Sequence, residues 1–319
     1  MMRSQGIKGP SYKLFYGNNK EIIHMTNKAS NNPMELSHQV FPTVLPHVHS
    51  WMKLYGPQAY WVFSEPDELI KEIFNNRDGA FPKPEPDDYT KKLIGEGIGT
   101  TRIPEKWLKL RRLSNHAFHA ECLKSMIPAM ITSVEMMLEK WRHNGGKEIE
   151  VFQEFKVLAS EIISRTAFGS SYLEGQRIFD MINQLTLIIG IHTDWQDKAR
   201  KEVLELFGQQ NPSSDTLSKM KIVSMIINEA LRLYPPVLNI PKAVQRQVRL
   251  GKLVLPANII IEIPVIALHH DPEIWGEDVC LFKPDRFAEG LAKATNNNVN
   301  AYLPFSLGSR SCVGYNFAI

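Results

Sequence analysis

Apolar residues recur at helical spacing through the middle of the chain, which predicts a mainly α-helical protein. Glycines 145 and 146 follow the second of three such stripes and Gly169 follows the third, as expected where helices end. A further helix is predicted from about residue 217 to 234, ended by Pro235 and Pro236. We expect each stripe to face a protein core. The three stripes are Trp107, Leu110, Leu113 and Ala117; Met130, Val134, Met137, Leu138 and Trp141; and Val151, Phe155, Leu158 and Ile162.

Extended segments flank this helical region. Runs of β-branched residues occur between residues 248 and 268, where Gly251 and the turn 256–258 divide them into short pieces typical of a hairpin or small sheet. Residues 50–75 predict a strand that enters a helix with Pro66 in its first turn. The alternating prolines of residues 81–88 exclude a helix there. The predicted fold class is therefore mainly α with a minor β-sheet.

Composition and charge narrow the functional classes only a little. The chain has 319 residues, of which 43% are hydrophobic and 22% charged, as in ordinary globular proteins. A net charge of +3 is too small to indicate nucleic acid as a partner. The polar N-terminal region and the rest of the chain contain no apolar run of membrane-spanning length, so no transmembrane anchor is predicted. Three widely separated cysteines predict no disulfide framework and favour a reducing compartment.

The segment PFSLGSRSCVG near the end of the chain carries the clearest chemistry. Gly308 and Gly314 bracket Cys312 and allow tight turns and close approach to a flat ligand. A cysteine thiolate can ligate iron, Arg310 can donate to a carboxylate, and Phe305 supplies an aromatic wall. A simple loop with a buried cysteine is the alternative when the cysteine is considered alone.

This segment resembles the haem-binding signature of cytochromes P450, Phe-x-x-Gly-x-Arg-x-Cys-x-Gly. The resemblance implies that the Cys312 thiolate holds the iron of haem b (iron protoporphyrin IX), with the other motif residues around the cofactor. Trp107 and Arg111 match the family's Trp-x-x-x-Arg, which donates hydrogen bonds to the haem propionates. Lys242 falls where relatives usually carry a propionate-binding arginine, so it keeps the charge but lacks the bidentate fork.

Two further motifs extend the resemblance over nearly the whole chain. Glu229 and Arg232 match the family's Glu-x-x-Arg helix, and Arg286 matches the arginine that joins them in a structural triad without a chemical role. His269 and His270 look like a metal-binding pair, but the resemblance implies a structural role for their segment. The likeness is to plant P450s of the clan that includes secologanin synthase.

The resemblance also predicts an incomplete P450 fold. The distal oxygen-activating helix, the roof helices and the C-terminal part have no counterpart, and an internal deletion is predicted near residues 187–192. Residues 1–319 are accordingly interpreted as one fragmentary P450 domain. No catalytic residue is assigned, because the oxygen-activating threonine segment is not found.

The implied activity is that of a haem-thiolate monooxygenase, which inserts one oxygen atom from O2 into a small apolar substrate. Electrons would come from NADPH through NADPH–cytochrome P450 reductase, docked on the basic face near Lys106, Lys109 and Arg112. The resemblance implies the cytosolic face of the endoplasmic reticulum membrane, with the membrane surface as a partner; a cytosolic location is the alternative without an anchor. Two other functions stay open: a non-catalytic truncated P450 that binds haem weakly or not at all, and a haem-based binding or sensing module.

Overall fold

In the computed structural model the chain divides into two compact units, which are described separately. Unit 1 comprises residues 1–111 and 231–312, and unit 2 comprises residues 112–230 and 313–319. This division does not test the single-domain interpretation, which stays a prediction. The structure describes residues 3–7, 9–11, 17–31, 37–55, 66–86, 91, 96–146, 148–168, 192–208 and 210–318.

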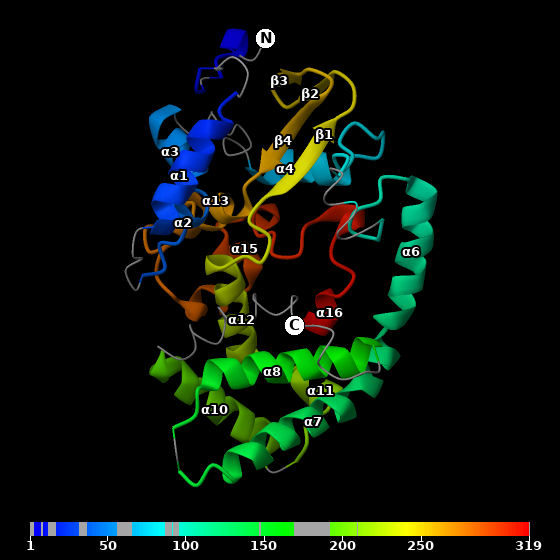
Figure 1. The fold of residues 1–319 in the computed structure, drawn as a ribbon, viewed down its shortest axis with the longest axis vertical. Coiled ribbons are helices and arrows are strands. Elements are labelled where there is room, and N and C mark those ends of the chain that lie inside the picture. The colour runs from blue at the N-terminus through cyan, green and yellow to red at the C-terminus, as the bar shows by residue number, and fades with distance from the viewer. Residues whose placement is uncertain are drawn as a thin grey trace. The chain divides into compact units, whose positions relative to one another are not determined.

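Helices dominate the described residues, as the apolar spacing predicts (Figure 1). Unit 1 holds α1 (Asn19–Asn31), α2 (Phe41–Val44), α3 (Pro46–Tyr55), α4 (Pro66–Asn75), α13 (Val265–His269), α14 (Pro272–Trp275) and α15 (Leu291–Ala294). Unit 2 holds α7 (Ala120–Arg142), α8 (Val151–Ile163), α10 (Thr193–Phe207), α11 (Ser214–Leu217) and α16 (Tyr315–Ala318). Helices α6 (Pro104–Ala117) and α12 (Lys221–Leu233) contribute to both units.

The segment 50–75 follows the prediction only in part. Helix α4 begins at Pro66, as expected, because proline suits the first turn of a helix. Residues 50–55 belong to α3 and are helical, so the predicted strand is wrong there. Its remaining part, residues 56–65, lies outside the described residues.

Unit 1 contains two small antiparallel ribbons, visible as the yellow and orange arrows of Figure 1. Strand β1 (Ile240–Val244) pairs with β4 (Ile259–Ile263), with Lys242 opposite Ile261. Strands β2 (Val248–Leu250) and β3 (Leu253–Leu255) form the predicted hairpin, whose turn contains Gly251 at φ 54°. The minor sheet of the predicted fold class is therefore confirmed.

The histidine pair has a structural role inside unit 1. His269 is fully buried, its Nδ1 lies 3.2 Å from the Arg232 carbonyl, and its Nε2 accepts from the Leu303 N–H at 2.9 Å. Burial lowers the pKa of His269 to about 3 and that of His270 to about 4, so both rings are neutral at pH 7. Across the described ranges, no group of three or more histidine, cysteine or carboxylate side chains is placed to hold a metal ion.

The three helical stripes are not buried as predicted. Helix α6 has no buried residue, and within α7 and α8 the only buried side chains among those described are Ser133 and Ser160. The expectation of a core is therefore wrong for these stripes, although α7 and α8 do pack on each other through Trp141 and Phe155, whose rings lie 6.0 Å apart. Periodicity identifies the apolar face of a helix, whereas burial also requires a partner element to cover it.

Two side chains hold backbone groups that regular structure leaves unpaired. In unit 1 the Gln5 amide donates to the Val254 carbonyl at 3.0 Å and accepts from the Val254 N–H at 2.7 Å, beside strand β3. In unit 2 the Glu202 carboxylate accepts from the first three N–H groups of α12, at 2.6, 2.8 and 3.0 Å. Such groups at a helix N-terminus have no partner within the helix, so Glu202 caps α12.

No helix in the described part of the chain combines the length and the apolar character needed to cross a bilayer.

Candidate functional site

The loop around Cys312 is fixed by its own backbone. The Cys312 N–H donates to the Phe305 carbonyl at 2.9 Å, and the Ser311 N–H donates to the Gly308 carbonyl at 3.1 Å. Gly308 has a φ of 73°, and a Cβ at this position would overlap the carbonyl oxygen of Phe74. Only glycine satisfies both conditions, so the first glycine of the predicted motif is required by close packing of two backbone segments.

The Cys312 side chain itself is exposed. Cys312 is therefore not a buried cysteine in a simple loop, which was the alternative interpretation. An exposed thiol is accessible to a ligand. Phe305, the predicted aromatic wall, is partly buried. Gly314 lies in unit 2, where an added Cβ would come within 3.3 Å of the Phe118 ring.

The predicted tryptophan–arginine pair of α6 meets this loop. The Arg310 guanidinium lies 4.7 Å from the centre of the Trp107 ring and donates to the Thr101 carbonyl at 3.0 Å. The Arg111 guanidinium donates to the Ser311 carbonyl at 2.5 Å. The one-turn spacing of Trp107 and Arg111 thus places both beside the Cys312 loop.

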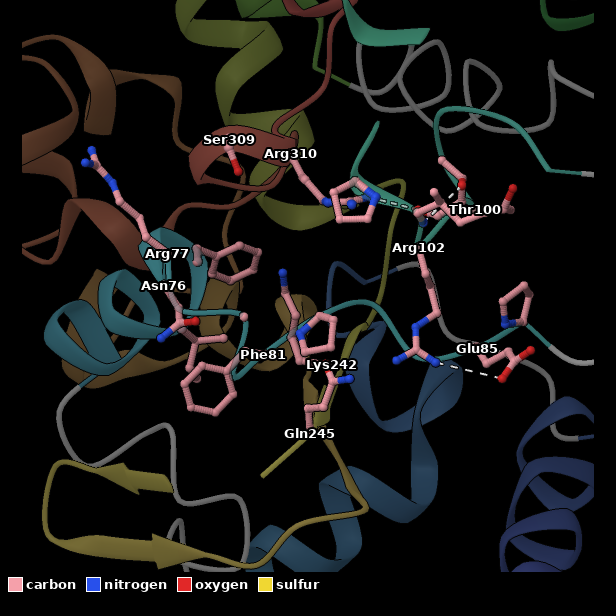
Figure 2. A pocket seen from close by; sticks show the side chains of 18 of the residues that line it. Asn76, Arg77, Phe81, Glu85, Thr100, Arg102, Lys242, Gln245, Ser309 and Arg310 are labelled. Carbon is pink, nitrogen blue, oxygen red and sulfur yellow. Dashed lines mark hydrogen bonds and ion pairs between the residues drawn. The ribbon is translucent and has the colours of Figure 1, made fainter. Parts of the chain in front are cut away.

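A pocket of about 670 Å³ lies next to the loop in unit 1. Figure 2 shows Lys242 from β1 and Arg310 from the 3-10 turn Gly308–Arg310 pointing toward the same hollow. The end of α4 and the segments 79–86 and 100–104 contribute to the remaining walls. Segments far apart in the sequence therefore form one site with a positively charged wall.

Lys242 and Arg310 belong to this wall, and Lys83 is close enough to interact with the charges of both. We call Lys83, Lys242 and Arg310 the cation cluster. The Lys242 ammonium lies 4.6 Å from the centre of the Phe74 ring, and only 6% of the residue is exposed. Burial, and to a smaller extent the charges of Lys83 and Arg310, lower its pKa to about 8. Burial and the charge of Arg310 also lower the pKa of Lys83, whose ammonium donates to the Gly99 carbonyl.

The carboxylates near the cluster are engaged by other cations. The Glu85 carboxylate lies 2.9 Å from the Lys91 ammonium and 3.8 Å from the Arg102 guanidinium. Figure 2 shows the pair of Glu85 and Arg102. Glu96 pairs with Lys106 at 2.5 Å. No carboxylate is among the described charges that shift the pKa of Lys242. Like charges gathered around the buried Lys242 are costly unless an anion joins them, so these residues fit the two carboxylates of a haem.

Lys83 is a residue that sequence reasoning missed. It lies between Pro82 and Pro84, in a stretch that was interpreted only as extended or turn structure. The rigid prolines could have indicated a fixed side chain, because they restrict the backbone on both sides. The sequence held no signal for its partners, since Arg310, whose charge lowers the pKa of Lys83, is more than two hundred positions away.

The predicted structural triad lies in buried surroundings. Arg232 donates to the carbonyl oxygens of His269 and Leu281, at 2.8 and 3.3 Å. Arg286 donates to the Trp275 carbonyl and to Asp278, whose backbone and carboxylate oxygens lie at 3.1 and 2.9 Å. Glu229 is also fully buried, on α12. The two arginines therefore fasten the segment 269–281, in keeping with a structural role.

The basic residues of α6 differ in their accessibility. Lys106 forms the ion pair with Glu96, whereas Lys109 and Arg112 are exposed. The predicted deletion near residues 187–192 falls almost entirely outside the described residues, and of these positions only His192 is described.

Comparison with known proteins identifies the chain's family. The Cytochrome P450 family model matches residues 8–191 and 187–319. Cytochrome P450 CYP749A22 of Panax ginseng is 43% identical over 434 aligned residues, which cover all of this chain and 82% of the ginseng protein. Cytochrome P450 734A1 of Arabidopsis thaliana is 31% identical, with 99% of this chain and 82% of the relative covered. Secologanin synthase 2 of Catharanthus roseus is 30% identical, and the alignment covers 100% of this chain and 83% of the relative. The chain belongs to the cytochrome P450 family.

Proposed function

We propose that this chain binds haem b through the Cys312 thiolate and acts as a monooxygenase on a small apolar substrate. Family membership implies an oxidoreductase with a cysteine-ligated haem. The observation that carries the assignment to Cys312 is its exposed thiol on the loop that also carries Arg310 of the cation cluster. Haem, when bound, supplies the chemistry that reduces O2 and inserts one of its oxygen atoms into a C–H bond.

The protein's own part in this proposal is to hold and orient the cofactor. Cys312 would be the iron ligand, and the hydrogen bond from its N–H to Phe305 would keep the loop backbone in place. Arg310 and Lys242 would bind the haem carboxylates, with Trp107 and Arg111 donating from α6. Gly308 would keep the loop close to α4 without a side chain between them.

Electrons would reach the haem from NADPH through NADPH–cytochrome P450 reductase. Lys109 and Arg112 offer exposed positive charge on α6, and acidic surfaces are steered to such positions. Lys106 contributes less to this surface, because its charge is paired with Glu96. We place the protein at the cytosolic face of the endoplasmic reticulum membrane, where plant members of the family typically act.

The optical spectrum of the reduced, carbon monoxide-treated protein tests the proposed ligand. A thiolate ligand is expected to give a strongly red-shifted Soret band, and Cys312→Ser is expected to lose that band. Cys122→Ser is the matched control, since Cys122 is also an exposed cysteine and lies on α7. A Soret band of the histidine-ligated type, or a band that survives Cys312→Ser, would contradict the assignment.

A second function, a non-catalytic truncated P450 that binds haem weakly or not at all, is favoured by one finding. The two family matches meet at residues 187–191, where the sequence predicts an internal deletion. The alignment with the ginseng relative spans 434 residues and so is longer than this 319-residue chain. We propose that residues 1–319 form a single P450 domain that lacks its oxygen-activating and roof helices.

Turnover separates the two functions. The purified chain with reductase, NADPH and a panel of small apolar compounds is expected to release oxygenated product if it is an enzyme. That product must disappear in Cys312→Ala. A thiolate-type spectrum with NADPH consumption but without product would support the non-catalytic alternative, because an incomplete distal side admits water and uncouples oxygen reduction.

A further inference from the structure

The cation cluster has a composition that makes ligand binding sensitive to protons. Two of its three members are lysines, which can lose their charge, whereas an arginine stays charged at all ordinary pH values. Lys242 is almost completely buried, and its pKa is lowered to about 8 because burial and two neighbouring cations oppose its charge. The other charged or polar residues that line the pocket are Asn76, Arg77, Glu85, Lys91, Glu96, Thr100, Thr101, Arg102, Gln245 and Ser309, and Glu262 lies on the adjacent strand β4.

We propose that Lys83, Lys242 and Arg310 bind the haem carboxylates in a proton-coupled manner, with Lys242 taking up a proton when the carboxylates arrive. This inference rests on the proposed haem function and concerns how the cofactor is gained and lost. It adds Lys83 to the residues that the motifs identify. It also predicts how a lysine at position 242 differs in its effect from the arginine that relatives usually carry there.

The direction of the effect follows from the charges. A carboxylate beside Lys242 favours the charged ammonium and moves its pKa from about 8 back toward the ordinary lysine value of 10.5. Below pH 8 the ammonium is already charged, so binding takes up no proton there. Between pH 8 and 10.5 binding takes up as much as one proton, and haem affinity falls by up to about tenfold per pH unit. An arginine at position 242 would not titrate in this range and would give no such loss.

The experiment measures the equilibrium partition of haem between the full chain and a haem-scavenging globin, followed by Soret absorbance from pH 7 to 9.5. The unsubstituted chain is compared with Lys242→Arg, which keeps the positive charge. Contributions from Cys312 and from the scavenger are common to both proteins and cancel in the ratio of their affinities. We expect that ratio to be constant below pH 8 and to shift by up to about tenfold per pH unit above it, with Lys242→Arg retaining haem better.

A chemically modified probe locates the effect on the carboxylates. Haem dimethyl ester has both carboxylates blocked, so it should bind the two proteins with the same pH dependence. The comparison of haem with its ester on the unsubstituted chain needs no variant and decides the question if Lys242→Arg does not fold. Lys83→Arg should remove a smaller part of the pH dependence, since Lys83 is less buried than Lys242.

The outcomes separate this inference from the proposed function. Parallel pH curves for the unsubstituted chain and Lys242→Arg, or a pH effect of equal size with the ester, would overturn the proton uptake while a thiolate-type spectrum still supports Cys312. Conversely, the expected pH difference without a thiolate-type band would support the cluster and contradict the ligand assignment. A chain that binds neither porphyrin would overturn both.

Discussion

Acid should destabilise this protein through a histidine that was expected only to be structural. The His269 ring is fully buried and uses both nitrogens on backbone groups, at Arg232 and Leu303. In the neutral ring, Nδ1–H donates to the Arg232 carbonyl and the unprotonated Nε2 accepts from the Leu303 N–H. Protonation would point a second N–H at the Leu303 N–H and bring a second positive charge next to Arg232. The pKa of His269 is therefore lowered, by burial first and by the charge of Arg232 second.

The size of the effect follows from the difference between the two states. The pKa is about 3 in the folded protein and 6.5 in the ordinary reference state, so the folded protein binds fewer protons between these values. Stability therefore falls as pH falls below 6.5, by about 1.4 kcal/mol per pH unit for one histidine. At pH 5 the loss from His269 amounts to about 2 kcal/mol, a large share of a typical net stability.

Urea unfolding followed by circular dichroism between pH 5 and 7.5 measures this dependence, with His269→Gln as the variant. The variant should be less stable at pH 7 by about 1–3 kcal/mol, because glutamine cannot reach both backbone partners. The difference in unfolding free energy between the variant and the unsubstituted protein should shrink by about 2 kcal/mol on going to pH 5, since glutamine does not titrate. His270 is present in both proteins and cancels, and His116→Gln controls for substitution of an exposed histidine. Parallel stability curves for His269→Gln and the unsubstituted protein would refute the reasoning.

Two further stability predictions use matched controls and the same urea assay. Gly308→Ala should lower the free energy of unfolding by about 2 kcal/mol more than Gly290→Ala, because both glycines have positive φ but only at position 308 does a Cβ overlap the backbone of Phe74. Equal losses of unfolding free energy in the two variants would show that the positive φ alone, and not the contact with Phe74, determines the effect. Glu202→Gln should cost about 1 kcal/mol, since it removes the charged cap of α12, whereas Glu205→Gln on the exposed face of α10 should cost almost nothing. A loss at position 205 as large as that at position 202 would argue against the cap.

Sequence reasoning succeeded where one local cause determines the structure. Proline at position 66 starts α4, and Gly251 closes the β2–β3 hairpin, because each residue restricts or frees its own backbone. Strand β1 was missed, since Pro241 and Lys242 interrupt the apolar pattern of a strand. Its pairing with β4 supplies what the local sequence does not indicate.

The candidate site shows the same contrast between local and long-range causes. Cys312, Gly308 and Arg310 lie within five positions, so a motif could identify them together. The roles of Lys83 and His269 depend on partners brought from distant segments, and no spacing in the sequence encodes them. The half-buried stripes of α7 and α8 likewise need a covering element that lies outside their own pattern.

The contact between Gln5 and strand β3 has a consequence for handling the protein. A side-chain amide here takes the place that a third strand would occupy, by engaging both the N–H and the carbonyl of Val254. Deamidation of Gln5 would replace the donor with a carboxylate oxygen that repels this carbonyl. The strand edge would then be open to pairing with a second molecule, so aged preparations should be prone to self-association through this hairpin.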